Sequence, residues 1–277
     1  MAFAIGRCLK AKRKVEYYIK MKPIKLYWSA SKKNVGDWLS PLIVGAQTKR
    51  SIEHAKANDC ELMSIGSILH KAKSRLWSPA IDVWGSGLIR DQAPKKTKHR
   101  IHAVRGKLTR DRVKAGNDVA VGDPGLLIAK VLPQYEATEK KYSIGLIPHY
   151  EDQTDPQVER FIAKNPSVKL LNILNDVEVF VKELTECEFI LSSSLHGLIM
   201  SDAYSIPNQW LVLSDKVEGN NFKFHDYYSV FDMESPEYTD LDSLNLERIA
   251  GIKSNYSRPG LHEVQQSLID AFPAELK

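Results

Sequence analysis

Short apolar runs alternate with stretches of helical spacing along most of the chain. In the first half, apolar runs of strand length occur at residues 24–28, 62–65, 81–84, 101–104 and 119–121, and most of them end in a glycine-bearing turn. Stretches with helical periodicity follow several of these runs, most clearly at residues 107–115 and 125–132. Short apolar strands that alternate with helices predict βαβ units and a mostly parallel sheet.

The same alternation starts again after a polar segment at residues 133–141. Apolar runs at 142–147, 168–173, 189–191 and 209–213 predict strands, and residues 156–164, 177–186 and 196–204 have helical spacing. The pattern therefore predicts an α/β fold of two Rossmann-like domains joined near residue 137, with the cleft between them as the natural site.

The boundaries of these patterns divide the chain. We expect a basic N-terminal extension at residues 1–21, an N-terminal Rossmann-like domain at 22–136, a C-terminal Rossmann-like domain at 137–235 and a helical tail at 236–277. The amphipathic stretch 260–271 is expected to pack back across the first domain. Residues 1–20 mix basic and apolar side chains, so they either contact an anionic membrane surface or form a solvated basic extension.

The composition narrows the classes of protein. With 277 residues, 43% hydrophobic and 26% charged, the chain can build substantial cores, which argues against disorder. A net charge of +5 is mild for a nucleic-acid binder and favours a small anionic substrate or association with a membrane surface instead. No apolar run approaches the ~20 residues that span a bilayer. The three cysteines are far apart, which is typical of a reducing cytoplasm.

Residues 189–207 carry the strongest chemical signal. An apolar run ends in three serines, a Leu-His-Gly turn follows, and a stretch of helical spacing then runs to a proline. The pattern predicts a strand that delivers His196 to the N-terminus of a helix, where unpaired N–H groups and the helix dipole favour an anion. Ser193, Ser194 and Gly197 make this a crowded polar turn rather than a core face. A proton-transferring side chain beside an anion site indicates an enzyme.

Two turns of the first half are further candidates. Asn34 and Asp37 lie just before a predicted helix that begins at Trp38, so Asp37 either caps that helix or contacts a substrate. Gly85 and Ser86 belong to a Gly-Ser-Gly turn, which would let the backbone approach a ligand closely.

Other chemically suggestive residues follow predicted strands or lie near the expected cleft. Arg105 directly follows a strand and either clamps an anion or serves the fold, and His149 stands where the second series of strands begins. Trp38 and Trp84, near the expected cleft, either stack on a ring of the substrate or pack in a core. The spacings typical of zinc sites and of the Gly-x-Ser-x-Gly elbow are absent from the sequence, so we expect neither a metal site nor a hydrolase triad.

Several of these turns occur in a defined order along the chain: Asn34-x-Gly36-Asp37, Arg105-Gly106-x-Leu108-Thr109-Arg110, Gly122-Asp123-Pro124 and Ser194-Leu195-His196-Gly197. Together they resemble the polysaccharide pyruvyl transferase family. The segment at residues 222–228 is similar to one in the bacterial exopolysaccharide ketal-transferase branch, which often has Arg where His225 stands. The resemblance covers residues 24–231.

The resemblance implies a two-domain fold like that of the GT-B glycosyltransferases. It also implies transfer of pyruvate from phosphoenolpyruvate to a sugar diol of a cell-surface or exopolysaccharide repeat unit, forming a pyruvate ketal. The N-terminal domain would hold the acceptor and the C-terminal domain the donor. The implied partners are phosphoenolpyruvate and a sugar or lipid-linked oligosaccharide at the cytoplasmic face of the membrane, without a cofactor, a metal ion or a nucleic acid.

The resemblance assigns roles to individual residues. His196 would be the general acid that protonates the methylene carbon of the enol, for which an ordinary pKa near ~6.5 suffices. Many members have Arg-Leu-His where this chain has Ser194-Leu195-His196, so another residue must supply the cation. The expected donor-binding residues are Ser193, Ser194, Gly197, Arg105, His149, Lys223 and His225. The expected acceptor-binding residues are Asn34, Asp37, Gly85 and Ser86.

Two other functions remain open from the sequence. A GT-B glycosyltransferase would move a sugar from a nucleotide donor, and its second domain would normally offer a carboxylate to the ribose. Asp202 and Asp215 are the carboxylates that follow His196 most closely, and neither is well placed for that task. A non-catalytic glycan-binding protein of the same fold is the second alternative.

Overall fold

The structure is a computed structural model that describes residues 22–31, 33–72, 77–214, 218–233 and 235–277. The predicted basic extension at residues 1–21, and with it the expected membrane contact, lies outside the described residues. Among the helices of the described ranges, none combines the length and the apolar character needed to cross a bilayer.

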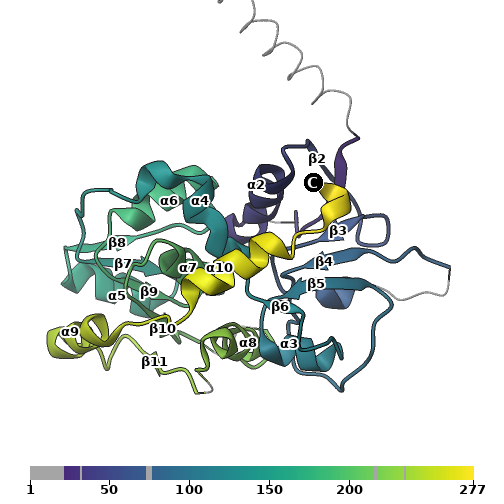
Figure 1. Cartoon of the computed structure of the whole chain (residues 1–277). Coiled ribbons are helices and arrows are strands. Elements are labelled where there is room, and N and C mark those ends of the chain that lie inside the picture. The colour runs from purple at the N-terminus through teal and green to yellow at the C-terminus, as the bar shows by residue number, and fades with distance from the viewer. Residues whose placement is uncertain (1–21, 32, 73–76, 215–217, 234) are drawn as a thin grey trace, which may run out of the picture.

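The fold is mixed α/β and contains two parallel sheets (Figure 1). The first sheet is six-stranded in the order β2-β1-β3-β4-β5-β6, and all its strand pairs are parallel. Its strands are β1 (Ile24–Tyr27), β2 (Ile52–His54), β3 (Leu62–Met63), β4 (Asp82–Trp84), β5 (Arg100–Val104) and β6 (Ala120–Val121).

The second sheet is five-stranded in the order β11-β10-β9-β7-β8, again with parallel pairs. Its strands are β7 (Ile144–Ile147), β8 (Val168–Leu170), β9 (Ile190–Ser192), β10 (Asn208–Leu211) and β11 (Tyr238–Thr239). The fully buried apolar run of β7 is typical of a parallel strand that is covered on both faces.

Helices connect the strands of both sheets. They are α2 (Val35–Thr48), α3 (Lys107–Arg112), α4 (Ile128–Val131), α5 (Pro156–Lys164), α6 (Val177–Thr185), α7 (Leu195–Ala203), α8 (Phe222–Tyr228), α9 (Leu246–Asn255) and α10 (Leu261–Asp270). Shorter 3₁₀ turns occur at Leu69–Lys71, Pro124–Leu127, Pro133–Tyr135, Ser229–Phe231 and Ala274–Leu276.

One apolar cluster joins the two halves of the chain. It includes Ile24 of β1, Leu39 and Ile43 of α2, Ile190 of β9 and Met200 of α7, all fully buried. The helix α2 contacts α4, α6 and α7, and its first N–H group, from Val35, donates to the Ile173 carbonyl at 2.8 Å. The N-terminus of α2 is therefore held between the two sheets.

The C-terminal helix α10 lies across the middle of the molecule (Figure 1). Trp84 of β4 donates its indole N–H to the Leu268 carbonyl of α10 at 2.8 Å, and its ring meets Phe272 edge to face. A buried network anchors the segment that precedes α10: Asp202 of α7 accepts hydrogen bonds from Tyr256 and Arg258 at 2.9 Å each. The stretch expected to pack back does contact the first sheet, through β6.

The structure differs from the sequence-based elements in several places. The predicted helix at residues 125–132 is split into the 3₁₀ turn Pro124–Leu127 and α4. The strand expected at 168–173 ends at Leu170. The strands β2 and β11 were not predicted, because β2 has three residues of which two are exposed and β11 has only two residues. The helix expected to begin at Trp38 begins at Val35 instead, because the Asn34 side chain accepts a hydrogen bond from Gly36 N at 2.9 Å and caps it.

Candidate functional site

The order of the strands in the two sheets determines where the candidate site lies. In the first sheet the chain leaves β1 for β2 on one side and then returns to β3 on the other. In the second sheet it leaves β7 for β8 on one side and then returns to β9 on the other. Each sheet thus has a topological switch point, and the segments that diverge from the carboxyl ends of the strands leave a crevice there. The residues after β1, β3, β7 and β9 line one shared pocket.

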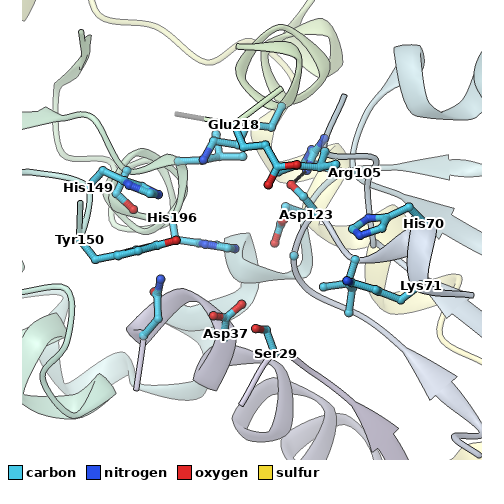
Figure 2. A pocket seen from close by; sticks show the side chains of 18 of the residues that line it. Ser29, Asp37, His70, Lys71, Arg105, Asp123, His149, Tyr150, His196 and Glu218 are labelled. Atoms are coloured by element: carbon cyan, nitrogen blue, oxygen red, sulfur yellow. Dashed lines mark hydrogen bonds between the residues drawn. The ribbon is translucent and has the colours of Figure 1, made fainter. Parts of the chain in front are cut away.

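This pocket has a volume of about 310 Å³. Figure 2 shows His196, Asp37 and Glu218 turned toward the same space, from α7, α2 and the segment before α8. Seven residues expected from the sequence line it: Asn34, Asp37, Arg105, His149, Ser194, His196 and Lys223. Residues from both halves of the chain therefore meet at one place.

His196 lies in the first turn of α7, directly after β9. Ser192 Oγ accepts a hydrogen bond from Ser194 N at 3.1 Å, and Gly197 has no room for a side chain because Ser192 packs against it. The imidazole lies against Gly36 of α2, where any Cβ atom would overlap Nδ1. Two elements from different halves thus fix the ring, and its Nε2 is buried without a hydrogen-bond partner among the described residues.

The protonation state of His196 differs from the expectation. Burial, with smaller contributions from the positive charges of Lys223 and Arg105, lowers the pKa of His196 to about 3. The imidazole is therefore neutral near pH 7 when the pocket holds no anion. The ordinary pKa assumed from the sequence is wrong for the free protein, because the sequence does not show how deeply the ring is packed.

Asp37 and Lys223 also have perturbed pKa values. Burial raises the pKa of the Asp37 carboxyl to about 7, against the opposing effect of the Lys223 charge. Burial and the like charge of Arg105 lower the pKa of Lys223 to about 8, and Asp37, Glu151 and Glu218 partly offset this. Groups with pKa values displaced toward neutrality in one pocket are typical of acid–base sites. Asp37 is in the first turn of α2 but is not its cap, so the substrate-contact interpretation gains support.

Arg105 lines the pocket but has other partners. Its Nε donates to Asp226 Oδ2 at 2.9 Å, and Nη2 forms an ion pair with the same oxygen at 2.8 Å. Nη1 donates to Ser67 Oγ at 2.6 Å, and Nη2 donates to the Leu88 carbonyl at 2.7 Å. Both charged side chains are fully buried. The structure therefore gives Arg105 a role in holding α8, which carries Lys223, and not primarily in clamping a ligand.

Asp226 performs a second task at the same place. It accepts hydrogen bonds from Thr109 N at 2.7 Å and Thr109 Oγ1 at 2.6 Å, so it caps the N-terminus of α3 from another helix. Gly106, the N-cap residue, lacks a side chain, and any Cβ there would overlap the Asp226 carbonyl. Residues 222–228 are thereby bound to α3 and to Arg105, which follow β5 of the first sheet.

Five expected site residues do not line the pocket: Gly85, Ser86, Ser193, Gly197 and His225. Gly85 has a positive φ of 90° and packs against the Pro124 ring, and Ser86 Oγ donates to the Gly66 carbonyl at 3.0 Å. Ser193 Oγ accepts a hydrogen bond from His149 N at 2.8 Å, so Ser193 holds the backbone of a pocket-lining residue. His225 packs edge to face on Trp210, with ring centroids 5.7 Å apart.

The sequence interpretation missed several lining residues, including Tyr27, Ser29, His70, Lys71, Asp123 and Glu218. Most of them lie shortly after strands, which is the signal that could have found them. Asp123 caps the 3₁₀ turn Pro124–Leu127, because its Oδ1 accepts a hydrogen bond from Gly125 N at 2.8 Å. Its Oδ2 is buried without a partner among the described residues, and burial raises the pKa of Asp123 to about 6.

Within the described part of the chain, His, Cys, Asp and Glu side chains form no group of three or more that could hold a metal ion.

Gly36 offers a test of the imidazole's position. We expect Gly36→Ala to lower turnover by about 10²-fold, because the new Cβ would displace the His196 ring by roughly 1 Å. The control is Gly45→Ala on the same helix, where a Cβ would meet only Ile52 Cγ1 at 3.6 Å. The measurements are the steady-state rate of the reaction catalysed at this pocket and the thermal melting of both variants. Equal rates in the two variants would contradict the conclusion that Gly36 fixes the position of the His196 ring.

Comparison with known proteins indicates the family of this chain. A family model described as polysaccharide pyruvyl transferase matches residues 76–215. An uncharacterized protein of Acanthamoeba polyphaga mimivirus is 31% identical over 164 residues, which are 56% of this chain and 56% of that protein. The succinoglycan biosynthesis protein ExoV of Rhizobium meliloti (strain 1021) is 24% identical over 214 residues, which are 75% of this chain and 64% of ExoV.

The chain thus spans less than two thirds of the length of either curated relative. A solved structure of an uncharacterized protein from Klebsiella pneumoniae is similar over 87% of this chain and 98% of that chain, with a TM-score of 0.41 and 11% identity.

Proposed function

Because this chain belongs to the polysaccharide pyruvyl transferase family, we propose that it transfers pyruvate from phosphoenolpyruvate to two hydroxyls of one sugar, forming a ketal. The acceptor would be a sugar of a cell-surface or exopolysaccharide repeat unit. The proposal rests mainly on one observation: His196, Asp37 and Lys223 converge on one pocket from α7, α2 and α8.

Lys223 and the N-terminus of α7 provide positive potential for the donor. The Lys223 ammonium lines this pocket and would take over the task of the family's expected Arg, and unpaired N–H groups in the first turn of α7 would favour the phosphate. His149 and Lys71 line the same pocket and add donors. We assign the positive charge of the missing Arg mainly to Lys223. Arg105 is already paired with Asp226, and His225 lies outside the pocket lining.

His196 is proposed as the general acid. The anionic donor would add negative charge beside the imidazole, so its binding would raise the pKa of His196 from its free value of about 3. The imidazolium then donates its proton to the methylene carbon of the enol, and the central carbon becomes oxocarbenium-like. Lys223 and the helix N-terminus stabilise the phosphate as it leaves.

Asp37 is proposed as the base that serves the acceptor. Its pKa of about 7 lets it take a proton from a sugar hydroxyl as that oxygen attacks the central carbon. The second hydroxyl attacks the same carbon as the C–O bond to phosphate breaks. One hydroxyl proton balances the proton delivered to the methylene carbon and the other leaves with phosphate, so the products are the ketal and inorganic phosphate.

This proposal includes the arrangement of the two halves. Residues after β1 and β3 would hold the acceptor, and residues after β7 and β9 would hold the donor, as in a GT-B-like cleft. Phosphoenolpyruvate is a cytoplasmic metabolite in this scheme, and the acceptor would be a lipid-linked oligosaccharide presented at the inner face of the membrane.

Phosphate release tests the proposed function. The protein is incubated with phosphoenolpyruvate and a panel of β-galactosides, β-glucosides and β-mannosides, and we expect release that depends on at least one acceptor. In parallel, uridine and guanosine diphosphates are tested for a thermal shift. No release with any acceptor, together with a shift caused by a nucleotide diphosphate, would replace the proposal with glycosyl transfer.

A further inference from the structure

A second cavity adjoins the reaction pocket. It has a volume of about 540 Å³ and lies between α2, Leu132 and the start of α6. Its walls combine an apolar floor, made by Trp38, Leu42 and Leu132, with polar groups at the edge. We call this cavity the Trp38 groove.

The Trp38 groove and the reaction pocket share the first turn of α2. Asn34 and Asp37 line the pocket, whereas their immediate neighbours Lys33 and Trp38 line the groove. Consecutive residues at the start of α2 thus line the two cavities in turn. A chain of linked sugars with one ring at Asp37 would have its next unit near this turn.

Trp38 is unusually exposed for a large aromatic side chain. Its exposed fraction is 41%, whereas Trp84, the other tryptophan near the expected cleft, is fully buried in the core. Trp28, which is 6% exposed, meets the Trp38 ring edge to face with the centroids 5.8 Å apart. Trp38 is thus a supported aromatic surface that keeps much of its area in contact with water, as binding surfaces do.

The edge of the groove can form hydrogen bonds. Lys33 and Asp176 form an ion pair at 2.6 Å, and the Glu178 carboxylate accepts a hydrogen bond from Tyr135 at 3.1 Å. Both carboxylates are largely exposed, so they retain acceptor capacity. An apolar face bordered by acceptors and donors matches a sugar ring, which has a C–H face and a rim of hydroxyls. An acyl chain would contact the apolar floor alone and form no hydrogen bonds with these polar groups.

We propose that the Trp38 groove is a subsite for the sugar units next to the one that receives pyruvate, with the ring of one unit stacked on Trp38. This inference rests on the proposed function, since it assumes that the acceptor's reacting unit lies at Asp37. It predicts that the protein recognises an oligosaccharide and not only the single sugar that it modifies.

Kinetics with short and long acceptors test the subsite. We expect Trp38→Ala to raise KM about tenfold for a tetrasaccharide acceptor while kcat and the KM for the corresponding monosaccharide glycoside stay unchanged. Trp38→Tyr should restore most of the loss. The matched control is Trp77→Ala, because Trp77 is 88% exposed and lines neither cavity. An equal effect of Trp38→Ala on short and long acceptors would overturn the subsite.

A binding measurement separates this inference from the proposed function. Indole fluorescence is titrated with gluco-, galacto- and manno-oligosaccharides in the absence of phosphoenolpyruvate. We expect a saturable change that Trp38→Ala removes and Trp77→Ala keeps. If the change is present but no phosphate is released in any assay, the Trp38 groove is an oligosaccharide-binding site and pyruvyl transfer falls. If none of the sugars changes the fluorescence at millimolar concentration, the subsite is wrong whatever the result for phosphate.

Discussion

Replacing His196 with alanine is expected to lower acceptor-dependent phosphate release by about 10²–10⁴-fold, the usual contribution of a general acid. The loss should appear mainly in kcat, because Lys223 and the N-terminus of α7 still bind the donor in the variant. The assay is phosphate release from phosphoenolpyruvate under saturating acceptor. The control is His262→Ala, which removes an exposed histidine of α10 that does not line the pocket.

The depressed pKa of His196 sharpens this prediction. The free imidazole has a pKa of about 3 and is neutral at pH 6, so it must gain a proton when the donor binds if it is to act as the acid. At pH 6, Asp37 with a pKa of about 7 and Lys223 with a pKa of about 8 are mostly protonated already and contribute little uptake.

Calorimetry in buffers of different ionisation enthalpy measures this uptake. We expect the wild-type protein to take up more protons on binding phosphoenolpyruvate at pH 6 than His196→Asn does. Equal uptake in the two proteins would show that the imidazole stays neutral in the complex. The proton would then have to come from another group of the pocket, and Asp37, which is mostly protonated at that pH, would be the first to examine.

Arg105→Ala is expected to lower the free energy of unfolding by about 3–5 kcal/mol, because it leaves the Asp226 carboxylate buried without its charged partner. Urea unfolding followed by fluorescence and circular dichroism measures the change. The control is Arg112→Ala, which breaks the exposed Arg112–Asp91 ion pair and should cost at most about 1 kcal/mol.

A double variant separates the ion pair from the loss of packing. Arg105→Met combined with Asp226→Leu should be less destabilised than the sum of the two single changes, because no charge is left buried alone. Additive effects would show that the two side chains do not interact energetically. Since Asp226 also caps α3, the Asp226→Leu change alone is expected to cost more than the Arg105→Met change.

Much of the local structure could be predicted from the sequence. The apolar run of β7 predicted a buried strand. The helix α5 begins at Asp155–Pro156 with a side-chain cap and a first-turn proline, which are both typical of a helix start. Edge strands were missed, because β2 is only three residues long and two of them are exposed. The pattern of apolar residues in a sequence cannot identify a strand whose residues are hardly buried.

Part of the candidate site could also be predicted, because some of its residues belong to local motifs. His196, Asp37 and Lys223 could be named because each belongs to a short motif, and motifs are local. His225 could be named from the same motif as Lys223, yet the helix α8 turns the two side chains in different directions: Lys223 lines the pocket and His225 packs on Trp210. Sequence spacing alone does not say which face of a short helix meets the ligand.

The sequence by itself determined the alternation of strands and helices, the polar turns at the strand ends and the family. These properties depend on neighbours within a few residues, where backbone geometry imposes periods of 2 and 3.6. Only the tertiary structure decided the strand order, which brings the turns after β1, β3, β7 and β9 to one pocket, and the packing of His196 against Gly36, which keeps the free imidazole neutral. Both depend on contacts between segments far apart in the chain, where burial and charge act through space and leave no periodic trace in the sequence.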